Sequence, residues 1–113
     1  MKIIQNDRTY QKEDRSTKRS IDRGIMKLSE KLAVYFENHM TIETIFNDDI
    51  LIHDIINKRF YVYKCQVDKI QLRILYMVQG DALIIVSHYC KKKSTKEYIS
   101  YFEKISHTYE NQR

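Results

Sequence analysis

The chain contains no proline and only two glycines among its 113 residues. It therefore has no proline-rich or glycine-rich linker of the kind that separates two domains. A chain of this length can bury one hydrophobic core. We expect residues 1–113 to form a single domain.

Long apolar runs are also missing. No stretch approaches the roughly 20 apolar residues that cross a bilayer, and the first residues, MKIIQNDRTY, lack the apolar core of a signal peptide. We therefore expect a soluble cytoplasmic protein with no membrane partner.

Cysteine is scarce and tryptophan is absent. Cys65 and Cys90 do not have the spacing of metal ligands, and neither do the acidic residues Asp48, Asp49 and Asp54. Both cysteines are expected to stay reduced and to pack as small apolar side chains. The sequence therefore predicts no metal site and no other cofactor.

The positive charge is concentrated in one part of the chain. The whole sequence carries +5, but residues 58–98 alone carry +6, whereas residues 41–57 contain four acids and no Lys or Arg. Because each phosphate contact releases counterions, a domain with such a basic unit is a candidate nucleic-acid binder. An ordinary solvated basic surface is the alternative.

Apolar periodicity predicts the N-terminal half less completely than the C-terminal half. Residues 2–5 could form a short strand, and apolar residues at three- and four-residue steps from Ile21 to His39 predict a helix. The charged residues 8–20 could add a second helix and so make a helical hairpin. Residues 41–57 are compatible with either helix or strand.

The C-terminal half has clearer signals. It contains three β-branched or aromatic strands, separated by turns at Asp68-Lys69 and Gly80-Asp81, and a capping box at Ser94 before a last helix. We predict an α+β fold: a small antiparallel sheet of three to four strands, N-terminal helices on one face, and a C-terminal helix on that same side.

Arg73 is the most informative residue, because a charged side chain in an alternating central strand is rare unless that face is open or functional. Antiparallel pairing brings the start of its strand near the end of the next one, where His88 is followed by Lys92. Tyr98 opens the last helix, and Lys64 could face the same way from the preceding strand. We expect Arg73, His88 and Lys92 to converge on one patch.

These residues also have ordinary structural interpretations. Arg73 could pair with an acid from residues 41–57, and His88 could be a polar residue at a strand end. Tyr98 could simply attach the last helix to the sheet. The lysines after the last strand could form a solvated loop that protects the sheet edge.

Residues 58–102 resemble the RelE/HigB/ParE superfamily of bacterial toxins from toxin–antitoxin pairs. The resemblance rests on the order of a basic strand, the strand QLRILY, an apolar strand, a basic run, and a helix that opens with tyrosine. Lys64 lies nine residues before Arg73, and Lys92 lies six residues before Tyr98, as in RelE-type members. HigB-like members end the last strand with a basic pair, which the lysine run supplies here.

The resemblance has one departure in its motif. Gln66 stands where RelE carries a second lysine, and the nearest substitute, Lys69, is in a turn. The N-terminal part matches only as a strand followed by helices. The implied fold is RelE-like.

If the activity is shared, the resemblance implies cleavage of mRNA in the ribosomal A site, by attack of a 2′-hydroxyl on the adjacent phosphate without a metal. Arg73 and Lys92 would stabilise the negative charge, and Lys64 would hold the backbone or lower the pKa of a neighbour. Tyr98, His88 or both would exchange protons. The phosphates of the RNA would be held by further lysines, namely Lys69, Lys91, Lys93 and Lys96.

The implied partners are the ribosome, mRNA and a cognate antitoxin that covers the basic face, and a homodimer remains open. Two other functions also remain open: a ParE-type inhibitor of DNA gyrase, and a non-catalytic phage or mobile-element module that binds nucleic acid or protein on the same scaffold. ParE-like sequences usually lack the full set of basic and tyrosine residues found here. The set therefore favours the nuclease.

Overall fold

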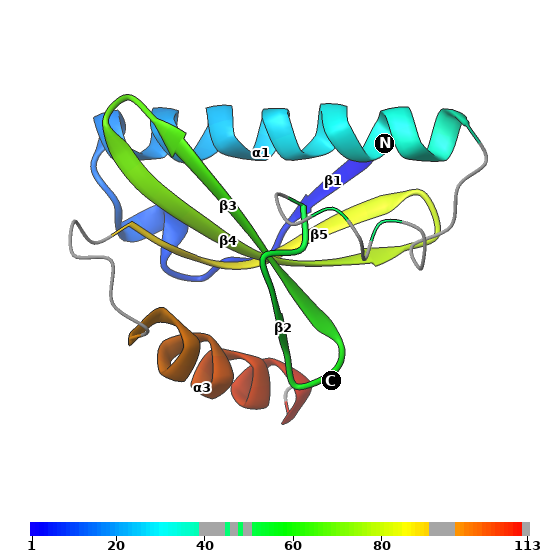
Figure 1. Ribbon diagram of the computed structural model, residues 1–113. Coiled ribbons are helices and arrows are strands. Elements are labelled where there is room, and N and C mark those ends of the chain that lie inside the picture. Colours follow the sequence, from blue (N-terminus) through cyan, green and yellow to red (C-terminus); the bar gives the residue numbers. More distant parts are fainter. Residues whose placement is uncertain (39–44, 46–47, 49–50, 91–96, 112–113) are drawn as a thin grey trace.

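A computed structural model describes residues 1–38, 45, 48, 51–90 and 97–111 (Figure 1). The described residues form one five-stranded sheet, two α-helices and a short 3-10 helix. In chain order the elements are β1 (Lys2–Gln5), the 3-10 helix (Tyr10–Lys12), α1 (Arg15–Glu37), β2 (Asp54–Ile56), β3 (Phe60–Val67), β4 (Ile70–Gln79), β5 (Ala82–Tyr89) and α3 (Glu97–Asn111).

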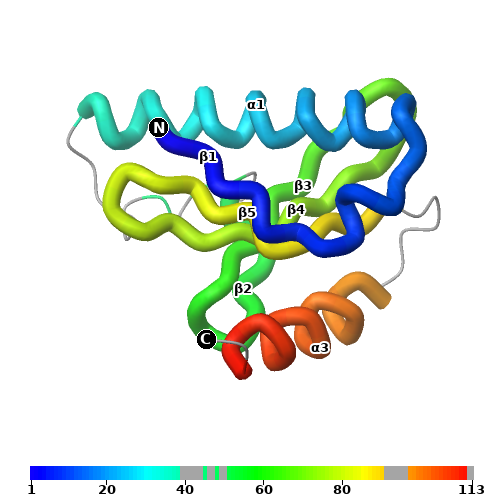
Figure 2. The backbone as a smooth tube through the Cα atoms, turned by 180° about the vertical axis from the view of Figure 1, so that it is seen from behind, coloured from blue at the N-terminus to red at the C-terminus, as the bar shows by residue number. Residues whose placement is uncertain are grey.

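The sheet is mixed and has the strand order β1-β5-β4-β3-β2. Strands β2 to β5 form an antiparallel meander, and β1 is added at the β5 edge as a parallel strand (Figure 2). We expected three to four antiparallel strands. The additional strand is β2, whose three residues are too few to show an alternating pattern.

Tight turns set the register of the meander. Asp68 and Lys69 both have positive φ, 52° and 69°, and Gly80 has a φ of 61°, so both predicted turns are present. Asn57 and Lys58 make a further turn between β2 and β3, with φ of 51° and 64°. Two consecutive residues with positive φ form a turn whose twist matches that of the two strands of a hairpin. The turns decide which side chains share a face.

The two α-helices cover opposite faces of the sheet, which corrects our expectation that they lie on one side (Figure 1). Alternation in β4 is as predicted: Leu72, Ile74 and Tyr76 belong to the core under α1, and Leu75 and Met77 belong to the core under α3. Because β4 and β5 are apolar on both faces, helices on one side only would leave half of these side chains in water.

Among the residues that the structure describes, no helix is long and apolar enough to cross a bilayer.

Helix α1 is the N-terminal layer. Its predicted apolar residues Ile21, Ile25, Leu28 and Leu32 are all buried. Asp14 caps the helix by accepting a hydrogen bond from the Thr17 amide at 2.7 Å, and this bond lowers the pKa of the Asp14 carboxyl. Residues 1–38 contain no second α-helix, so the helical hairpin that we considered is not formed there.

Gly24 allows α1 to approach the sheet closely. A Cβ atom at this position would lie 2.5 Å from Leu72 Cδ2 and 3.4 Å from both Cys65 Sγ and Ile74 Cδ1. Leu72 and Ile74 are fully buried, so neither side chain has free space into which it could move. The glycine is therefore explained by packing.

We expect Gly24→Ala to lower the free energy of unfolding by up to about 2 kcal/mol. The gain in helix propensity is about 1 kcal/mol, whereas overpacking of a buried site costs about 1–3 kcal/mol. Denaturant unfolding measures the difference, with the exposed Met26→Ala on the same helix as the control. A more stable Gly24→Ala variant would show that helix propensity outweighs the contact with Leu72.

Candidate functional site

Three of the predicted catalytic residues lie on the α3 face of the sheet. Lys64 on β3 is directly opposite Arg73 on β4, and Arg73 is opposite Tyr89 on β5. Directly opposed residues point to the same face. Tyr98, in the first turn of α3, covers Arg73, and the Arg73 Cζ lies 4.4 Å from the centroid of the Tyr98 ring.

Arg73 is buried without a full set of hydrogen bonds. Its exposed fraction is 3%, and its Nε and Nη1 atoms have no hydrogen-bond partner among the described residues. The expected alternative, an ion pair between Arg73 and an acid of residues 41–57, is not seen in the described part of that segment. Lys64, by contrast, is exposed.

A buried cation with two donors that lack partners in the described part of the chain is energetically costly. The effective cost of burying one ion is several kcal/mol, and a desolvated cation–π contact such as that with Tyr98 returns about 2 kcal/mol. The arrangement therefore favours the binding of an anion beside Arg73. A phosphate beside the guanidinium would balance its charge and give one of these donors an acceptor.

Tyr98 is held by a residue that our sequence analysis did not connect with it. Its hydroxyl donates a hydrogen bond to Oδ2 of Asp54 on β2, and His53 Nε2 lies 3.9 Å from the same oxygen. Burial, then the bond to Asp54, raises the pKa of Tyr98 to about 12, although nearby Arg73 lowers it. The hydroxyl is thus a proton donor at neutral pH, and the Asp54 contact also attaches α3 to the sheet.

His88 is on the other face of the sheet, so it does not join Arg73 as we expected. It is opposite Ile74, whose side chain packs under α1, and it is itself buried. Its Nδ1 is hydrogen-bonded to Oδ2 of Asp7. Burial lowers the pKa of His88, but the bond to Asp7 and the charges of Asp7 and Glu13 outweigh it and raise the pKa overall.

Most of the predicted RNA-binding lysines lie outside the described residues. Lys92 of the catalytic set, together with Lys91, Lys93 and Lys96 of the RNA-binding set, lies outside the described residues. Lys69 is exposed in the turn between β3 and β4, beside Asp68. Asp68 forms an ion pair with Arg23 of α1 at 2.5 Å, which places this turn next to the helix.

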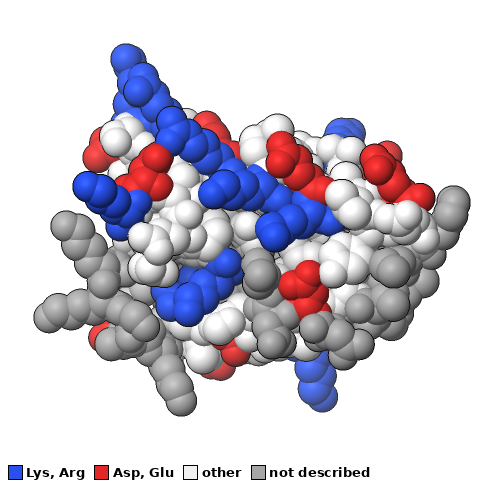
Figure 3. Space-filling view, turned by 45° about the horizontal axis from the view of Figure 1, so that its top comes forward, with Lys and Arg blue, Asp and Glu red and all other residues white. Residues whose placement is uncertain are grey.

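Helix α1 carries a basic ridge that the apolar periodicity did not reveal. Figure 3 shows Lys and Arg in a band across the face on which α1 lies. Residues four apart are neighbours on a helix surface. The basic ridge comprises five exposed residues at this spacing: Arg15, Arg19, Arg23, Lys27 and Lys31.

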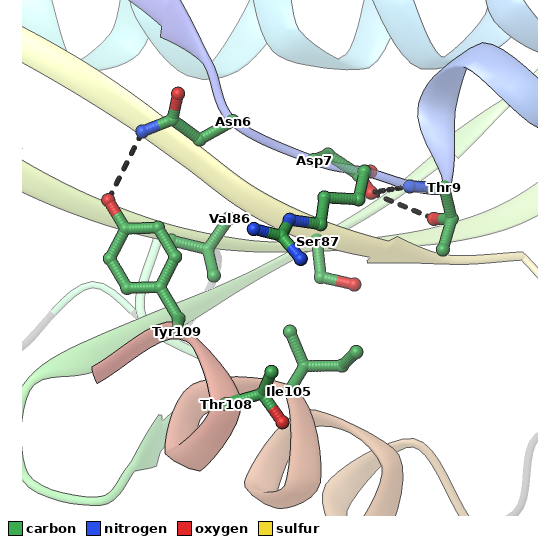
Figure 4. A pocket seen from close by; sticks show the side chains of 9 residues that line it. Asn6, Asp7, Thr9, Val86, Ser87, Ile105, Thr108 and Tyr109 are labelled. Carbon is green, nitrogen blue, oxygen red and sulfur yellow. Dashed lines mark hydrogen bonds between the residues drawn. The ribbon is translucent and has the colours of Figure 1, made fainter. Parts of the chain in front are cut away.

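A small cavity lies between the start of the chain, β5 and α3 (Figure 4). Asn6 donates to the Tyr109 hydroxyl at 3.1 Å on one side, and the buried Ser87 Oγ has no hydrogen-bond partner among the described residues. The cavity has a volume of about 60 Å³, which suits a few water molecules and excludes a nucleotide. The cavity is therefore not the candidate RNA site.

Comparison with known proteins adds no relative. A scan against protein-family models gives no match, and searches of curated proteins and of solved structures give none either. The chemistry of the α3 face rests on four residues: Lys64, Arg73, Asp54 and Tyr98. We call these four residues the Arg73 cluster.

Proposed function

We propose that the protein is a ribosome-dependent endoribonuclease that cleaves mRNA and inhibits translation, as the RelE/HigB resemblance implies, and that a cognate antitoxin neutralises it. The observation that carries the proposal is the buried guanidinium of Arg73, whose Nε and Nη1 lack partners among the described residues. The cross-strand position of Lys64 and the contact with Tyr98 support it.

The chemistry in this proposal is an internal transesterification. The 2′-oxygen forms a bond to the adjacent phosphorus, the bond to the 5′-oxygen breaks, and a 2′,3′-cyclic phosphate remains on the upstream fragment. Negative charge grows on the non-bridging oxygens, where Arg73 and Lys64 act by electrostatic stabilisation. The resemblance implies the same charge-stabilising role for Lys92.

Proton transfer is assigned to Tyr98 and to His53, which lies beside the Arg73 cluster. Tyr98, protonated at neutral pH, donates to the departing 5′-oxygen, which is a far stronger base than a phenolate. His53, beside Asp54, is our candidate for the base that takes the proton of the 2′-hydroxyl. His88 has no part in this scheme because it faces α1.

Access to Arg73 requires a local movement. The guanidinium is almost completely covered, and the ring of Tyr98 is part of the cover. An RNA phosphate reaches the guanidinium when this ring turns away and the hydroxyl leaves Asp54. The same movement brings the hydroxyl to the substrate.

The function is tested in a reconstituted translation reaction with a defined mRNA, run with and without ribosomes. We expect cleavage that depends on ribosomes. An intact message would contradict the nuclease, and inhibition of DNA gyrase by the same preparation would then favour the ParE-type alternative.

A second candidate function is a non-catalytic nucleic-acid-binding module, favoured by the basic ridge of α1. In that case RNA affinity would depend on the ridge and would fall steeply with salt. Arg19→Gln combined with Lys27→Gln would then weaken RNA binding, whereas Arg73→Met would leave it unchanged. The nuclease proposal expects cleavage to depend on Arg73.

A further inference from the structure

Three potential metal ligands from distant parts of the chain meet at the end of β5. They are the carboxylate of Glu13 before α1, the imidazole of His88 in β5, and the thiol of Cys90 directly after it. Glu13 Oε2 lies 3.7 Å from His88 Nε2 and 3.9 Å from Cys90 Sγ. All three ligand atoms lie within 4.8 Å of one another.

These separations are close to those of a tetrahedral zinc site. Zinc binds nitrogen and oxygen at about 2.0–2.2 Å and sulfur at about 2.3 Å, so two ligand atoms on one tetrahedral zinc are roughly 3.3–3.6 Å apart. The observed distances exceed this by a few tenths of an ångström for the two pairs that include Glu13. Glu13 thus contacts both groups only at long range, as an ion pair with His88 and a weak hydrogen bond from the Cys90 thiol. A rotation of the Glu13 side chain, which is 29% exposed, would shorten both of these distances.

The imidazole of His88 is already oriented as a ligand. Its Nδ1 is hydrogen-bonded to Asp7, and this leaves Nε2 directed toward Glu13. A carboxylate on the far nitrogen is the usual outer partner of a metal-bound histidine, because it fixes the ring and its tautomer. Asp7 is itself held: its Oδ1 accepts from both the amide and the hydroxyl of Thr9, at 3.0 and 2.8 Å (Figure 4).

The site has room for a fourth ligand. Thr9, Tyr89 and Tyr101 line a pocket of about 230 Å³ together with the three potential ligands. A water molecule or a small anion fits such a space. Three protein ligands and an open position are the arrangement of zinc sites that bind an exchangeable ligand.

The alternative is a purely structural ion pair, in which a protonated His88 lies between Asp7 and Glu13. It accounts for the histidine and the two carboxylates, but it leaves Cys90 only a weak hydrogen bond to Glu13. The thiol donates to Glu13 at 3.9 Å, and both burial and the charge of Glu13 raise the pKa of Cys90. A divalent cation accounts for all three groups, because it balances one carboxylate and one thiolate.

We propose that Glu13, His88 and Cys90 bind Zn²⁺, with Asp7 orienting His88 and a solvent molecule in the fourth position. The cation joins the segment before α1 to the end of β5, and it lies on the opposite face of the sheet from Arg73. The proposal is independent of RNA cleavage.

The test is a titration of the full-length, reduced, chelator-treated protein with Co²⁺, followed by displacement with Zn²⁺. We expect one equivalent of Co²⁺ to give a thiolate-to-metal absorption band that Zn²⁺ removes. Cys90→Ser is expected to lose the band. Cys65→Ser is the matched control, because Cys65 is the other half-buried free thiol, and it should keep the band.

Further variants separate ligands from a general loss of folding. Glu13→Gln, at a half-exposed position, should weaken binding of Co²⁺ while the protein stays folded by circular dichroism. Asp7→Asn should weaken binding by about 10- to 100-fold and keep the thiolate band. Absence of the band in the wild type, its persistence in Cys90→Ser, or its loss in Cys65→Ser would overturn the proposal.

Discussion

Replacement of Arg73 by methionine is expected to lower the rate of mRNA cleavage by about 100- to 1000-fold, which is the usual effect of removing one donor that stabilises a developing anion. The same substitution is expected to raise the free energy of unfolding by about 1–2 kcal/mol. Methionine removes a buried charge whose desolvation costs several kcal/mol, and it gives up a cation–π contact worth about 2 kcal/mol. Loss of activity with a gain of stability is the signature of a residue kept for function.

The two readouts are the cleavage rate in a reconstituted translation reaction and denaturant unfolding. Arg59→Met is the control, because Arg59 is exposed and its ion pair with Glu110, at 3.5 Å, is on the surface. We expect both its activity and its stability to stay near the wild type. A strongly destabilised Arg73→Met variant would instead identify Arg73 as a structural residue.

Tyr98→Phe is expected to lower the cleavage rate by about 100- to 10,000-fold, the range for loss of a general acid. The variant removes only the hydroxyl, which holds the ring over Arg73 through Asp54, so RNA affinity should not fall. The pH–rate profile of the wild type should show no loss of activity near neutral pH from ionisation of Tyr98, since its pKa is raised to about 12.

The matched control for Tyr98→Phe is Tyr101→Phe, one turn further along α3. It should cleave at the wild-type rate. His53→Gln, measured in the same assay, tests the candidate base and is expected to be slow. Full activity in Tyr98→Phe would show that the hydroxyl has only a structural role, which is to attach α3 to Asp54.

Local patterns in the sequence predicted the parts of the fold that depend on neighbouring residues. The alternation of β4 correctly assigned Leu72 and Ile74 to one face and Arg73 to the other. The turn at Asp68-Lys69 has the register that places Lys64 opposite Arg73. These features follow from a two-residue repeat and a two-residue turn.

Contacts between distant segments could not be predicted in this way. Asp54 is 44 residues from Tyr98, and Asp7 is 81 residues from His88, so neither contact leaves a periodic signal. Residues 41–57, which include Asp54, were considered only as a source of an acid for Arg73, and the irregular segment that carries Asp7 was assigned no role. His88 was placed with Arg73 because only the strand end, and not the face, was considered.

The face on which α3 packs also could not be predicted from the pattern of the helix itself. An amphipathic helix after the last strand can pack on either face, and its own pattern does not decide between them. The decision comes from β4 and β5, whose second apolar face needs a cover. Counting the apolar residues on both faces of these strands would have predicted it.

The most direct test of the central claim is the chemistry of the cut ends. mRNA recovered from the reconstituted translation reaction would be analysed for 2′,3′-cyclic phosphate at each mapped cut, for the wild type and for Arg73→Met. We expect cyclic phosphate ends with the wild type and their loss with the variant. An intact message, or cuts that persist unchanged in Arg73→Met, would contradict the account of the Arg73 cluster as an RNA-cleaving site.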